Sequence, residues 1–240
     1  MAFDELKESV WQANMGLVRA GLVVLTWGNV SGADRAAGVM AIKPSGLPYD
    51  RLRAEDIVVV SLRTGAVIDG QLNPSSDTPT HLCLYRAFDR VGGVAHAHSA
   101  AATSWAQACR EIPCFGTTHA DHFYGPVPVT RALTEEELRG DYEESTGQAI
   151  VERFRQGRLN PEHVPAVLVC GHAPFAWGAS AAKALENMIV LEEVARMALQ
   201  SLALNPSLGP IAPGLLDRHF LRKHGPEAYY GQKSPPPKPV

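Results

Sequence analysis

The sequence predicts a mixed α/β or α+β sandwich, in which helices pack against a central sheet. Short apolar runs that are typical of strands alternate along the chain with longer segments of helical spacing. Hydrophobic residues make up 45% and charged residues 20% of the chain, which excludes collagen-like, disordered and coiled-coil classes. The elements lack a regular β-α-β spacing and a Gly-x-Gly-x-x-Gly motif, so a dinucleotide-binding fold is not expected.

The first third of the chain is expected to hold one helix and two strands with their turns. Between Asp4 and Arg19 the apolar residues recur at near-helical spacing, and Gly21 follows as a stop signal. The segments 38–42 and 57–62 are short, apolar and bounded by turn residues, as strands are.

The middle of the chain is expected to alternate between helices and strands. Serines and Pro79 mark the start of a helix that continues through 81–88. The segment 92–98 fits a strand, 100–108 fits a helix, and 164–170 fits a buried strand.

Three further segments complete the prediction. Residues 179–204 contain no Gly or Pro and are rich in helix formers, so they predict a helix. The segment 117–125 lacks any periodicity and predicts a loop, whereas Thr134 is a suitable cap for a helix start at 135–137.

The length of 240 residues suits one large domain. We expect residues 1–232 to form it and the Pro-rich residues 233–240 to be extended and disordered. The formal net charge of −3 gives no general attraction to nucleic acid. The N-terminus is acidic and amphipathic, and no apolar run approaches about 18 residues, so we expect a cytoplasmic protein without membrane contact.

The four cysteines agree with a reducing compartment. Cys83, Cys109, Cys114 and Cys170 are dispersed, and none belongs to a C-x-x-C pair. We therefore expect small buried thiols rather than disulfides or a thiolate metal site.

Three histidines and one aspartate form a candidate metal site. His96 and His98 lie two residues apart in an expected strand, so both side chains project from one face about 6.6–6.8 Å apart. His172 follows an apolar run whose end could open into a cleft, and three histidines with an open position can form a catalytic zinc site. Asp77, at the front of a helix, could add an oxygen ligand that a substrate displaces.

The alternative for each histidine is a buried, hydrogen-bonded side chain. The chain has nine histidines, so a chance H-x-H is not rare. For the pair His96 and His98 the spacing favours a metal site, whereas for His172 alone both interpretations stay open.

Three segments could bind an anion. Ser75 and Ser76 stand at a helix N-terminus, where hydroxyls and free N–H groups attract phosphate. The segments 26–31, which includes Asn29, and 43–46 combine glycines with hydroxyl, amide or ammonium donors. Each segment alone would normally be a cap or a turn, but together they indicate a phosphorylated small molecule.

An acid–base role is open for Asp121, which lies between two histidines in the predicted loop. A structural role for this His-rich loop is equally compatible with its sequence. Tyr230 would by itself indicate aromatic packing at a domain edge.

Taken together, the motifs resemble the class II aldolase and adducin family, and within it the epimerases that act on a ketopentose phosphate. The resemblance runs from the first helix to about Gln232 and depends on the ordered combination, because H-x-H alone is not specific. It implies an α/β/α sandwich around a central, mainly antiparallel sheet, assembled as a homotetramer with active sites between subunits. In order, the motifs are T-W-G-N-V-S, K-P-S-G, N-P-S-S-D-T-P-T-H, H-A-H, T-T-H-A-D, C-G-H-A-P and A-Y-Y-G-Q.

The resemblance also implies roles for single residues. His96, His98 and His172 would hold one divalent ion per subunit, usually Zn²⁺, with Mn²⁺ or Co²⁺ as alternatives. Asp77 matches a position where the aldolases carry Glu as the proton-transfer base and the epimerases carry Asp as a ligand. The substrate and phosphate positions are matched by Asn29, Lys43, Ser45, Gly46, Ser75 and Ser76.

Asp121 and Tyr230 match the acid–base pair of these epimerases. Tyr230 and His219 are expected to reach the site from the adjacent subunit. The Pro-rich extension beyond Gln232 departs from the family pattern, because these chains usually end near that position.

The implied reaction interconverts L-ribulose 5-phosphate and D-xylulose 5-phosphate. Because C4 is not acidic, the C3–C4 bond would be broken by retro-aldol cleavage and re-formed on the other face of the aldehyde. An L-fuculose- or L-rhamnulose-type phosphate aldolase, a decarboxylase or dehydratase of the superfamily, and a non-catalytic adducin-like module are the alternatives. Asp77 disfavours the phosphate aldolase, and the T-T-H-A-D and Y-Y-G-Q motifs disfavour the decarboxylase or dehydratase. The adducin-like module typically lacks the metal ligands that this chain retains.

Overall fold

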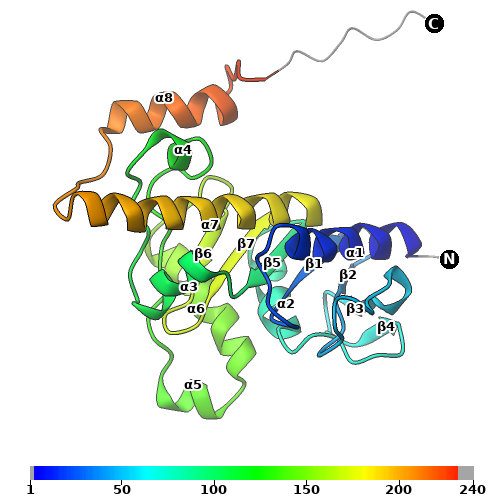
Figure 1. Cartoon of the computed structure of the whole chain (residues 1–240). Coiled ribbons are helices and arrows are strands. Elements are labelled where there is room, and N and C mark those ends of the chain that lie inside the picture. The colour runs from blue at the N-terminus through cyan, green and yellow to red at the C-terminus, as the bar shows by residue number, and fades with distance from the viewer. Residues whose placement is uncertain (1–2, 232–240) are drawn as a thin grey trace, which may run out of the picture.

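Seven strands form one sheet at the centre of the protein (Figure 1). The computed structural model describes residues 3–231. The strand order is β4-β3-β2-β1-β5-β7-β6, and every neighbouring pair is antiparallel. The strands are β1 (Gly28–Asp34), β2 (Val39–Ile42), β3 (Val58–Ser61), β4 (Val67–Asp69), β5 (Gly93–Ala97), β6 (Ala166–Leu168) and β7 (Pro174–Gly178).

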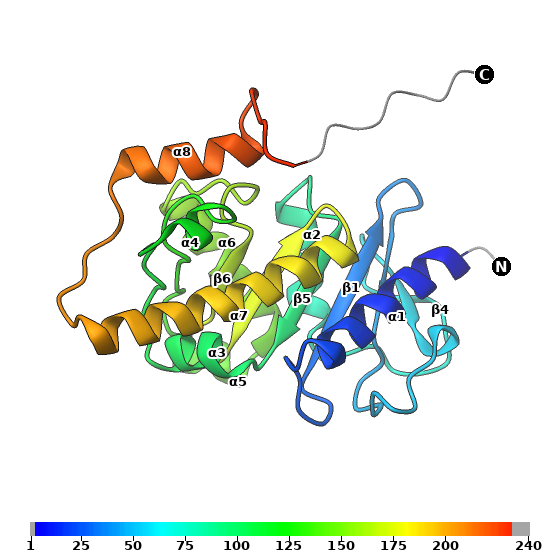
Figure 2. The same cartoon turned by 45° about the horizontal axis from the view of Figure 1, so that its top comes forward.

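Helices cover both faces of the sheet (Figure 2). One hydrophobic cluster joins α1, α3 and α7 to one face, and a second joins α2 and α6 to the other. The helices are α1 (Asp4–Arg19), α2 (Thr78–Ala87), α3 (Ala100–Gln107), α4 (Thr117–Ala120), α5 (Glu135–Arg139), α6 (Tyr142–Gln156), α7 (Ala181–Leu204) and α8 (Pro213–His224), with a short 3₁₀ turn at Ala54–Asp56.

The alternation of side chains along the strands explains the two clusters. Val39 and Ala41 of β2 belong to the first cluster, whereas Met40 and Ile42 belong to the second. Every residue of β2 is therefore buried, as the continuous apolar run required. The expected α/β/α sandwich around an antiparallel sheet is confirmed.

Most predicted elements are present, and the differences concern both polar segments and one buried strand. The first helix has the bounds that were predicted, and α5 begins with the expected capping box at Thr134. The prediction of a loop at 117–125 is wrong at its start, because α4 occupies Thr117–Ala120. No local pattern in the sequence marked β7, α6 or α8. Much of the segment 26–31, which was expected to bind an anion as a loop, belongs to strand β1. The predicted Pro-rich tail lies outside the described residues.

The expectation that all cysteines are free thiols is wrong. Cys109, just after α3, forms a disulfide with Cys170, which follows β6. Cys83 and Cys114 are free, and Cys114 is buried. The two linked residues are 61 positions apart in sequence, so no local spacing motif could reveal the pair.

Within residues 3–231, no helix is both long and apolar enough to cross a membrane.

The close contact between β5 and α7 predicts that a side chain at position 93 would destabilise the fold. Gly93 pairs with Gly32 of β1 and Gly178 of β7, and a Cβ at Gly93 would overlap the backbone of Ser180 at the start of α7. Because backbone cannot yield as a flexible side chain does, Gly93→Ala should lower the free energy of unfolding by about 3 kcal/mol. Urea unfolding would measure this loss. Gly209→Ala is the matched control, because a Cβ there meets nothing within 4 Å, and equal stability of the two variants would contradict the prediction.

Candidate metal and anion site

One cavity of about 570 Å³ brings together ten of the predicted site residues. We call it the histidine cavity. Its predicted members are Asn29, Lys43, Ser45, Gly46, Ser75, Ser76, Asp77, His96, His98 and His172.

The three imidazoles of this cavity form a nearly equilateral triangle. The ring centroids are 5.0 Å apart for His96 and His98, 5.0 Å for His96 and His172, and 4.9 Å for His98 and His172. One nitrogen of each ring lies within 4.8 Å of the other two. Asp77 lines the same cavity but does not belong to this group of mutually close ligand atoms.

The sheet sets the position of each histidine. His96 lies in the central strand β5, paired with Asn29 of β1 and Phe175 of β7. His98 follows the end of β5, and His172 lies in the turn between β6 and β7. The Phe175 ring stacks on the His96 ring with centroids 4.2 Å apart, so the apolar core supports the inner wall of the site.

Glycine allows β1 to approach β5 closely at the mouth of the cavity. Gly28 has φ +119°, and a Cβ on it would lie 2.7 Å from the carbonyl oxygen of His96. A side chain at this position would therefore separate the two strands that carry Asn29 and His96.

The chemical state of the imidazoles suits a divalent metal ion. His96 Nδ1 lies 2.9 Å from the carbonyl oxygen of Pro174, so Nδ1 donates to this carbonyl and Nε2 is the ring nitrogen left to bind a metal ion. Burial and the neighbouring imidazoles lower the pKa of His172 to about 4 and also lower the pKa of His98. Neutral imidazoles are the form that binds metal.

Asp77 is held as a carboxylate beside the histidines. Burial would raise its pKa, but His96, His81 and a hydrogen bond from Asn29 together lower it. Asn29 Nδ2 donates to Asp77 Oδ2 at 2.6 Å and to Ser75 Oγ at 3.1 Å. The buried Asn29 Oδ1 has no hydrogen-bond partner among the described residues, so it is available to a donor of a bound ligand.

Two paired loops form the part of the cavity that suits an anion. The Ser75 N–H donates to the Lys43 carbonyl oxygen at 3.0 Å, and the Ser45 N–H donates to the Asn73 carbonyl oxygen at 2.9 Å. These bonds bring Lys43 to the front of α2, where the helix dipole favours negative charge. The Lys43 ammonium lies 4.9 Å from the Tyr49 ring centroid. Burial lowers the pKa of Lys43 to about 8.

Two further residues line the cavity without any signal in the sequence, Tyr142 and Glu143 at the start of α6. Tyr142 OH lies 3.4 Å from His172 Nδ1. No motif marks these residues, because only the packing of α6 against α2 brings them to the site. Thr80 Oγ1 donates to the Glu143 carbonyl oxygen at 2.6 Å and joins the two helices.

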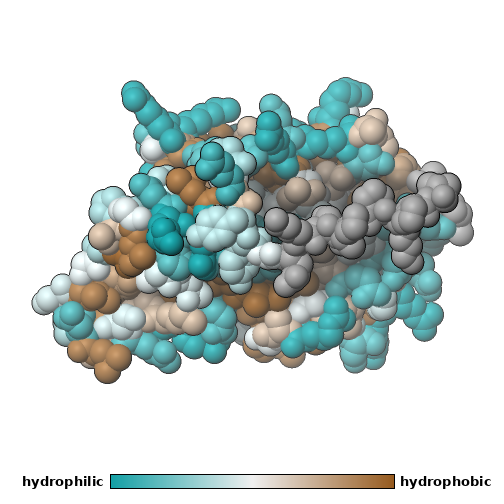
Figure 3. All heavy atoms as spheres, turned by 90° about the horizontal axis from the view of Figure 1, so that it is seen from above, coloured by the Kyte–Doolittle hydropathy of each residue, from teal (hydrophilic) through white to brown (hydrophobic). Residues whose placement is uncertain are grey.

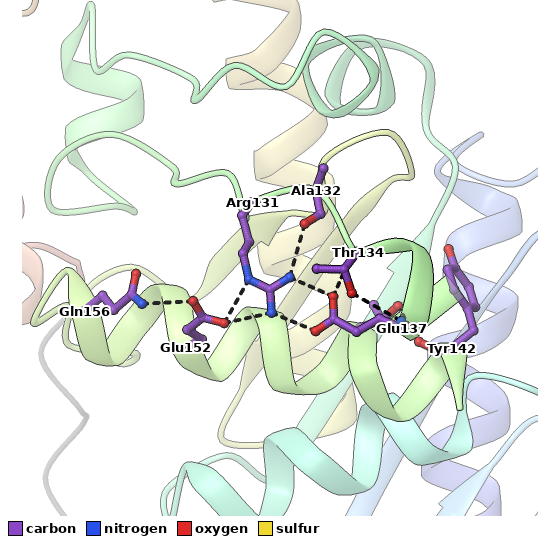
Figure 4. Close-up of polar contacts among 8 residues, drawn as sticks. Arg131, Ala132, Thr134, Glu137, Tyr142, Glu152 and Gln156 are labelled. Carbon is purple, nitrogen blue, oxygen red and sulfur yellow. Dashed lines mark hydrogen bonds and ion pairs between the residues drawn. The ribbon is translucent and has the colours of Figure 1, made fainter. Parts of the chain in front are cut away.

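Arg131 fixes the neighbouring helices near Tyr142 (Figure 4). Its guanidinium donates to both carboxylate oxygens of Glu137 on α5 at 2.8 Å and to Glu152 on α6 at 3.0 Å. The two hydrogen bonds from Arg131, together with Thr134, lower the pKa of Glu137 to about 2. The turn that leads into Tyr142 is therefore braced on both sides.

The other three predicted residues lie together outside the histidine cavity. Asp121 follows α4 and contacts α8, which lies beside α4 (Figure 1). His219 Nδ1 is 3.0 Å from Asp121 Oδ1, and Arg222 donates to both oxygens of the Asp121 carboxylate. Tyr230 lies over Arg222 and Lys223, with its ring centroid 4.4 Å from the Lys223 ammonium. We call these five residues the α8 cluster.

Asp121 is ionised within this cluster. Burial would raise the pKa of its carboxyl group, but hydrogen bonds from Arg222 and His219 and the charge of Lys223 lower it. The neighbouring His119 has a structural role, because it is buried and its Nε2 bonds the Gly125 carbonyl oxygen at 2.8 Å.

Comparison with known proteins supports the resemblance that the motifs indicate. Residues 8–199 match the model of the Class II Aldolase and Adducin N-terminal domain. The L-ribulose-5-phosphate 4-epimerases UlaF of Salmonella paratyphi B and Salmonella typhi are each 53% identical over 230 residues, covering 96% of this chain and 100% of the relative.

Solved structures share the fold. An L-fuculose 1-phosphate aldolase superposes with a TM-score of 0.74 at 24% identity, over 90% of this chain and 94% of that chain. The L-fuculose-1-phosphate aldolase from Thermus thermophilus has a TM-score of 0.64 at 24% identity, over 86% and 98% of the two chains.

The lowered pKa of Lys43 predicts how anion binding depends on pH. Lys43 is protonated below about pH 8 and loses its charge above it, whereas a phosphate monoester is mainly a dianion above about pH 6. Affinity for a phosphate monoester such as glycerol phosphate should therefore be highest between these values and fall by up to about tenfold per pH unit above pH 8. Calorimetric titration from pH 6 to pH 9.5 measures this. Lys43→Arg keeps its charge, so it should show no alkaline loss, and a loss of the same size in both proteins would refute the assignment.

Proposed function

The chain belongs to the class II aldolase and adducin family, and on this basis we propose that it is an L-ribulose-5-phosphate 4-epimerase. It interconverts L-ribulose 5-phosphate and D-xylulose 5-phosphate by breaking and re-forming the C3–C4 bond. The identity of 53% over the whole length of a curated epimerase carries this proposal. The histidine cavity supports it, because three imidazoles with mutually close nitrogens lie beside Lys43 and the serines of the anion loops in one space.

The metal centre consists of His96, His98 and His172, with Asp77 as an oxygen ligand, and zinc is the ion proposed for it. A divalent ion bound there would supply Lewis acidity that stabilises negative charge on the C2 and C3 oxygens of the substrate. Pro174 holds His96 in the tautomer that leaves Nε2 free, and Asn29 holds the Asp77 carboxylate in place.

The anion loops bind the substrate phosphate. Lys43 supplies positive charge, and Ser45, Gly46, Ser75 and Ser76 supply hydroxyl and N–H donors at the start of α2. The Asn29 Oδ1, which has no partner among the described residues, accepts from a substrate hydroxyl. Cleavage gives the enediolate of dihydroxyacetone and glycolaldehyde phosphate. Because the phosphate stays bound, the aldehyde can rotate and present its other face for re-addition.

Proton transfer at the C4 oxygen requires one group for each epimer, and Asp121 and Tyr230 fill these roles. Asp121 is ionised at neutral pH, so it begins as the proton acceptor. Arg222 and His219 orient its carboxylate through hydrogen bonds.

The α8 cluster acts on the histidine cavity of a neighbouring subunit. None of Asp121, His219 and Tyr230 is among the described residues that line the cavity of their own chain. Since Asp121 and His219 are hydrogen-bonded to each other, they reach the neighbouring cavity as one unit. A homotetramer of this kind, with residues 1–232 as its single catalytic domain, is proposed to work in the cytoplasm.

Apolar side chains on the helices near the α8 cluster support association of subunits. Figure 3 views the face that carries α8 and shows hydrophobic residues at the surface among hydrophilic ones. Single exposed apolar residues are common, but several on two consecutive helices favour an interface. The exposed large hydrophobic residues on α7 and α8 are Met197, Leu199, Leu204, Leu215 and Leu221.

A coupled assay tests the reaction. Purified protein should convert L-ribulose 5-phosphate to D-xylulose 5-phosphate without releasing free dihydroxyacetone and glycolaldehyde phosphate. Release of both fragments at the rate of turnover, trapped by added dehydrogenases, would identify an aldolase instead. Prolonged chelation should abolish the conversion and added zinc should restore it. Full activity of a metal-free preparation would remove the Lewis-acid step.

Asp121→Asn tests the proton-transfer assignment. The amide keeps the shape of the side chain but cannot take up the proton, so kcat should fall by about 10²–10⁴-fold while the bound metal stays unchanged. Asp217→Asn is the matched control, because Asp217 lies on α8 and bonds Tyr124 OH outside the cluster. Near-normal turnover of Asp121→Asn, or an equal loss in both variants, would show that the assignment is wrong.

A further inference from the structure

The Cys109–Cys170 disulfide lies next to the proposed metal ligands. Cys170 stands two residues before His172, and Cys109 stands just beyond the C-terminal end of α3. The N-terminal end of α3 begins two residues after His98. The disulfide therefore closes a covalent path from His98 through α3 to His172.

Non-covalent contacts along this path show that α3 is otherwise well anchored. The buried Glu192 carboxylate accepts from the N–H groups of Ala101 and Ala102 at the start of α3. At the other end, the Gly171 N–H donates to the Ala106 carbonyl oxygen at 2.9 Å. The segment that carries His172 is thus tied to a fixed helix by one backbone hydrogen bond and one disulfide.

The environment of the four cysteines singles out this pair for redox chemistry. Cys109 is exposed at the surface and has φ +49°, a conformation that non-glycine residues rarely adopt. The Arg110 N–H donates to the Trp105 carbonyl oxygen at 3.1 Å, so Cys109 is the left-handed residue that ends α3. Cys83 and Cys114 are less reactive, because burial raises the pKa of each thiol to about 11.

We propose that Cys109 and Cys170 form a redox switch that controls the metal affinity of the three-histidine site. The oxidised form fixes the position of His172 and binds zinc tightly, whereas the reduced form lets the turn of His172 move and binds zinc more weakly. This inference rests on the proposed metal site. Disulfides in a reducing compartment are usually transient or redox-sensing, which suits a switch better than a permanent staple.

The chemistry of the switch is thiol–disulfide exchange with a small-molecule disulfide such as oxidised glutathione. The sulfur of Cys109 attacks one sulfur of that disulfide, breaks its S–S bond and releases one thiol. Cys170 then attacks the mixed disulfide, forms the Cys109–Cys170 bond and releases the second thiol. Two electrons and two protons pass from the protein to the oxidant, and a dithiol reductant reverses the process.

Thermodynamic linkage makes the effect reciprocal. If oxidation strengthens zinc binding, zinc must make the disulfide harder to reduce by the same free energy. A tenfold difference in zinc affinity corresponds to a shift of about 30 mV in the two-electron reduction potential. This second measurement does not depend on enzymatic activity.

The experiment uses the full-length Cys83→Ser/Cys114→Ser protein, in which only the proposed pair can react. One sample is oxidised. A second sample is reduced with a phosphine, which is then removed in the absence of oxygen. Both samples are titrated with zinc in the presence of a chromophoric chelator that competes for the ion. We expect zinc to dissociate at least about tenfold more readily from the reduced protein. The reduction potential of the pair, read by alkylation and mass spectrometry, should be lower by about 30 mV or more when zinc is bound. Cys109→Ser/Cys170→Ser should bind zinc like the reduced form.

Each other outcome overturns the switch and locates the error. Equal zinc affinity of the two redox forms means that the disulfide is a structural link only. Failure of oxidised glutathione to form the Cys109–Cys170 peptide cross-link means that the pair is not exchangeable. Absence of zinc binding in both forms contradicts the proposed metal site as well. If Cys109→Ser/Cys170→Ser does not fold, comparison of the two redox forms still decides the question.

Discussion

The structure depends on the pairing of β5 with β1 on one side and β7 on the other. This register places Asn29 opposite His96 and His96 opposite Phe175, so it determines which side chains face the cavity and which face the core. Because side chains alternate along a strand, a slip by one residue would turn His96 toward the opposite face of the sheet. The position of His96 in the histidine cavity is therefore set by the sheet, whereas the packing of α6 on α2 adds Tyr142 to the same cavity.

The two parts of the proposed active site differ in how they are stabilised. The imidazoles lie on strand ends and a short turn, supported by Phe175 and the Pro174 carbonyl oxygen. The α8 cluster instead depends on charge, with Asp121 surrounded by Arg222, Lys223 and His219. Desolvation disfavours protonated imidazoles and so suits metal ligands, whereas cationic neighbours keep a carboxylate ionised for proton transfer. Because the two environments are separate, the pKa of the His172 imidazole and the pKa of the Asp121 carboxyl group are set independently.

The sequence could predict the parts of the site that local patterns encode. Alternation along a strand was enough to place His96 and His98 on one face, and serines before a proline were enough to locate the start of α2. His172 was ambiguous by itself, because its meeting with β5 depends on the pairing of β7 and became predictable only through the ordered family motifs. Tyr142 had no signal, because its place at the cavity results from the packing of α6 on α2. Cys109 and Cys170 were misinterpreted for a similar reason, since a contact between residues 61 positions apart leaves no mark in local spacing.

The placement of Asp121 and the three histidines in separate regions of one chain has a genetic consequence for the proposed assembly. A chain defective in the imidazoles would still offer a sound α8 cluster, and a chain defective in Asp121 would still offer a sound cavity. When two such chains co-assemble, some junctions between them combine the intact halves. Two alleles that are each inactive alone would then complement one another within a mixed oligomer.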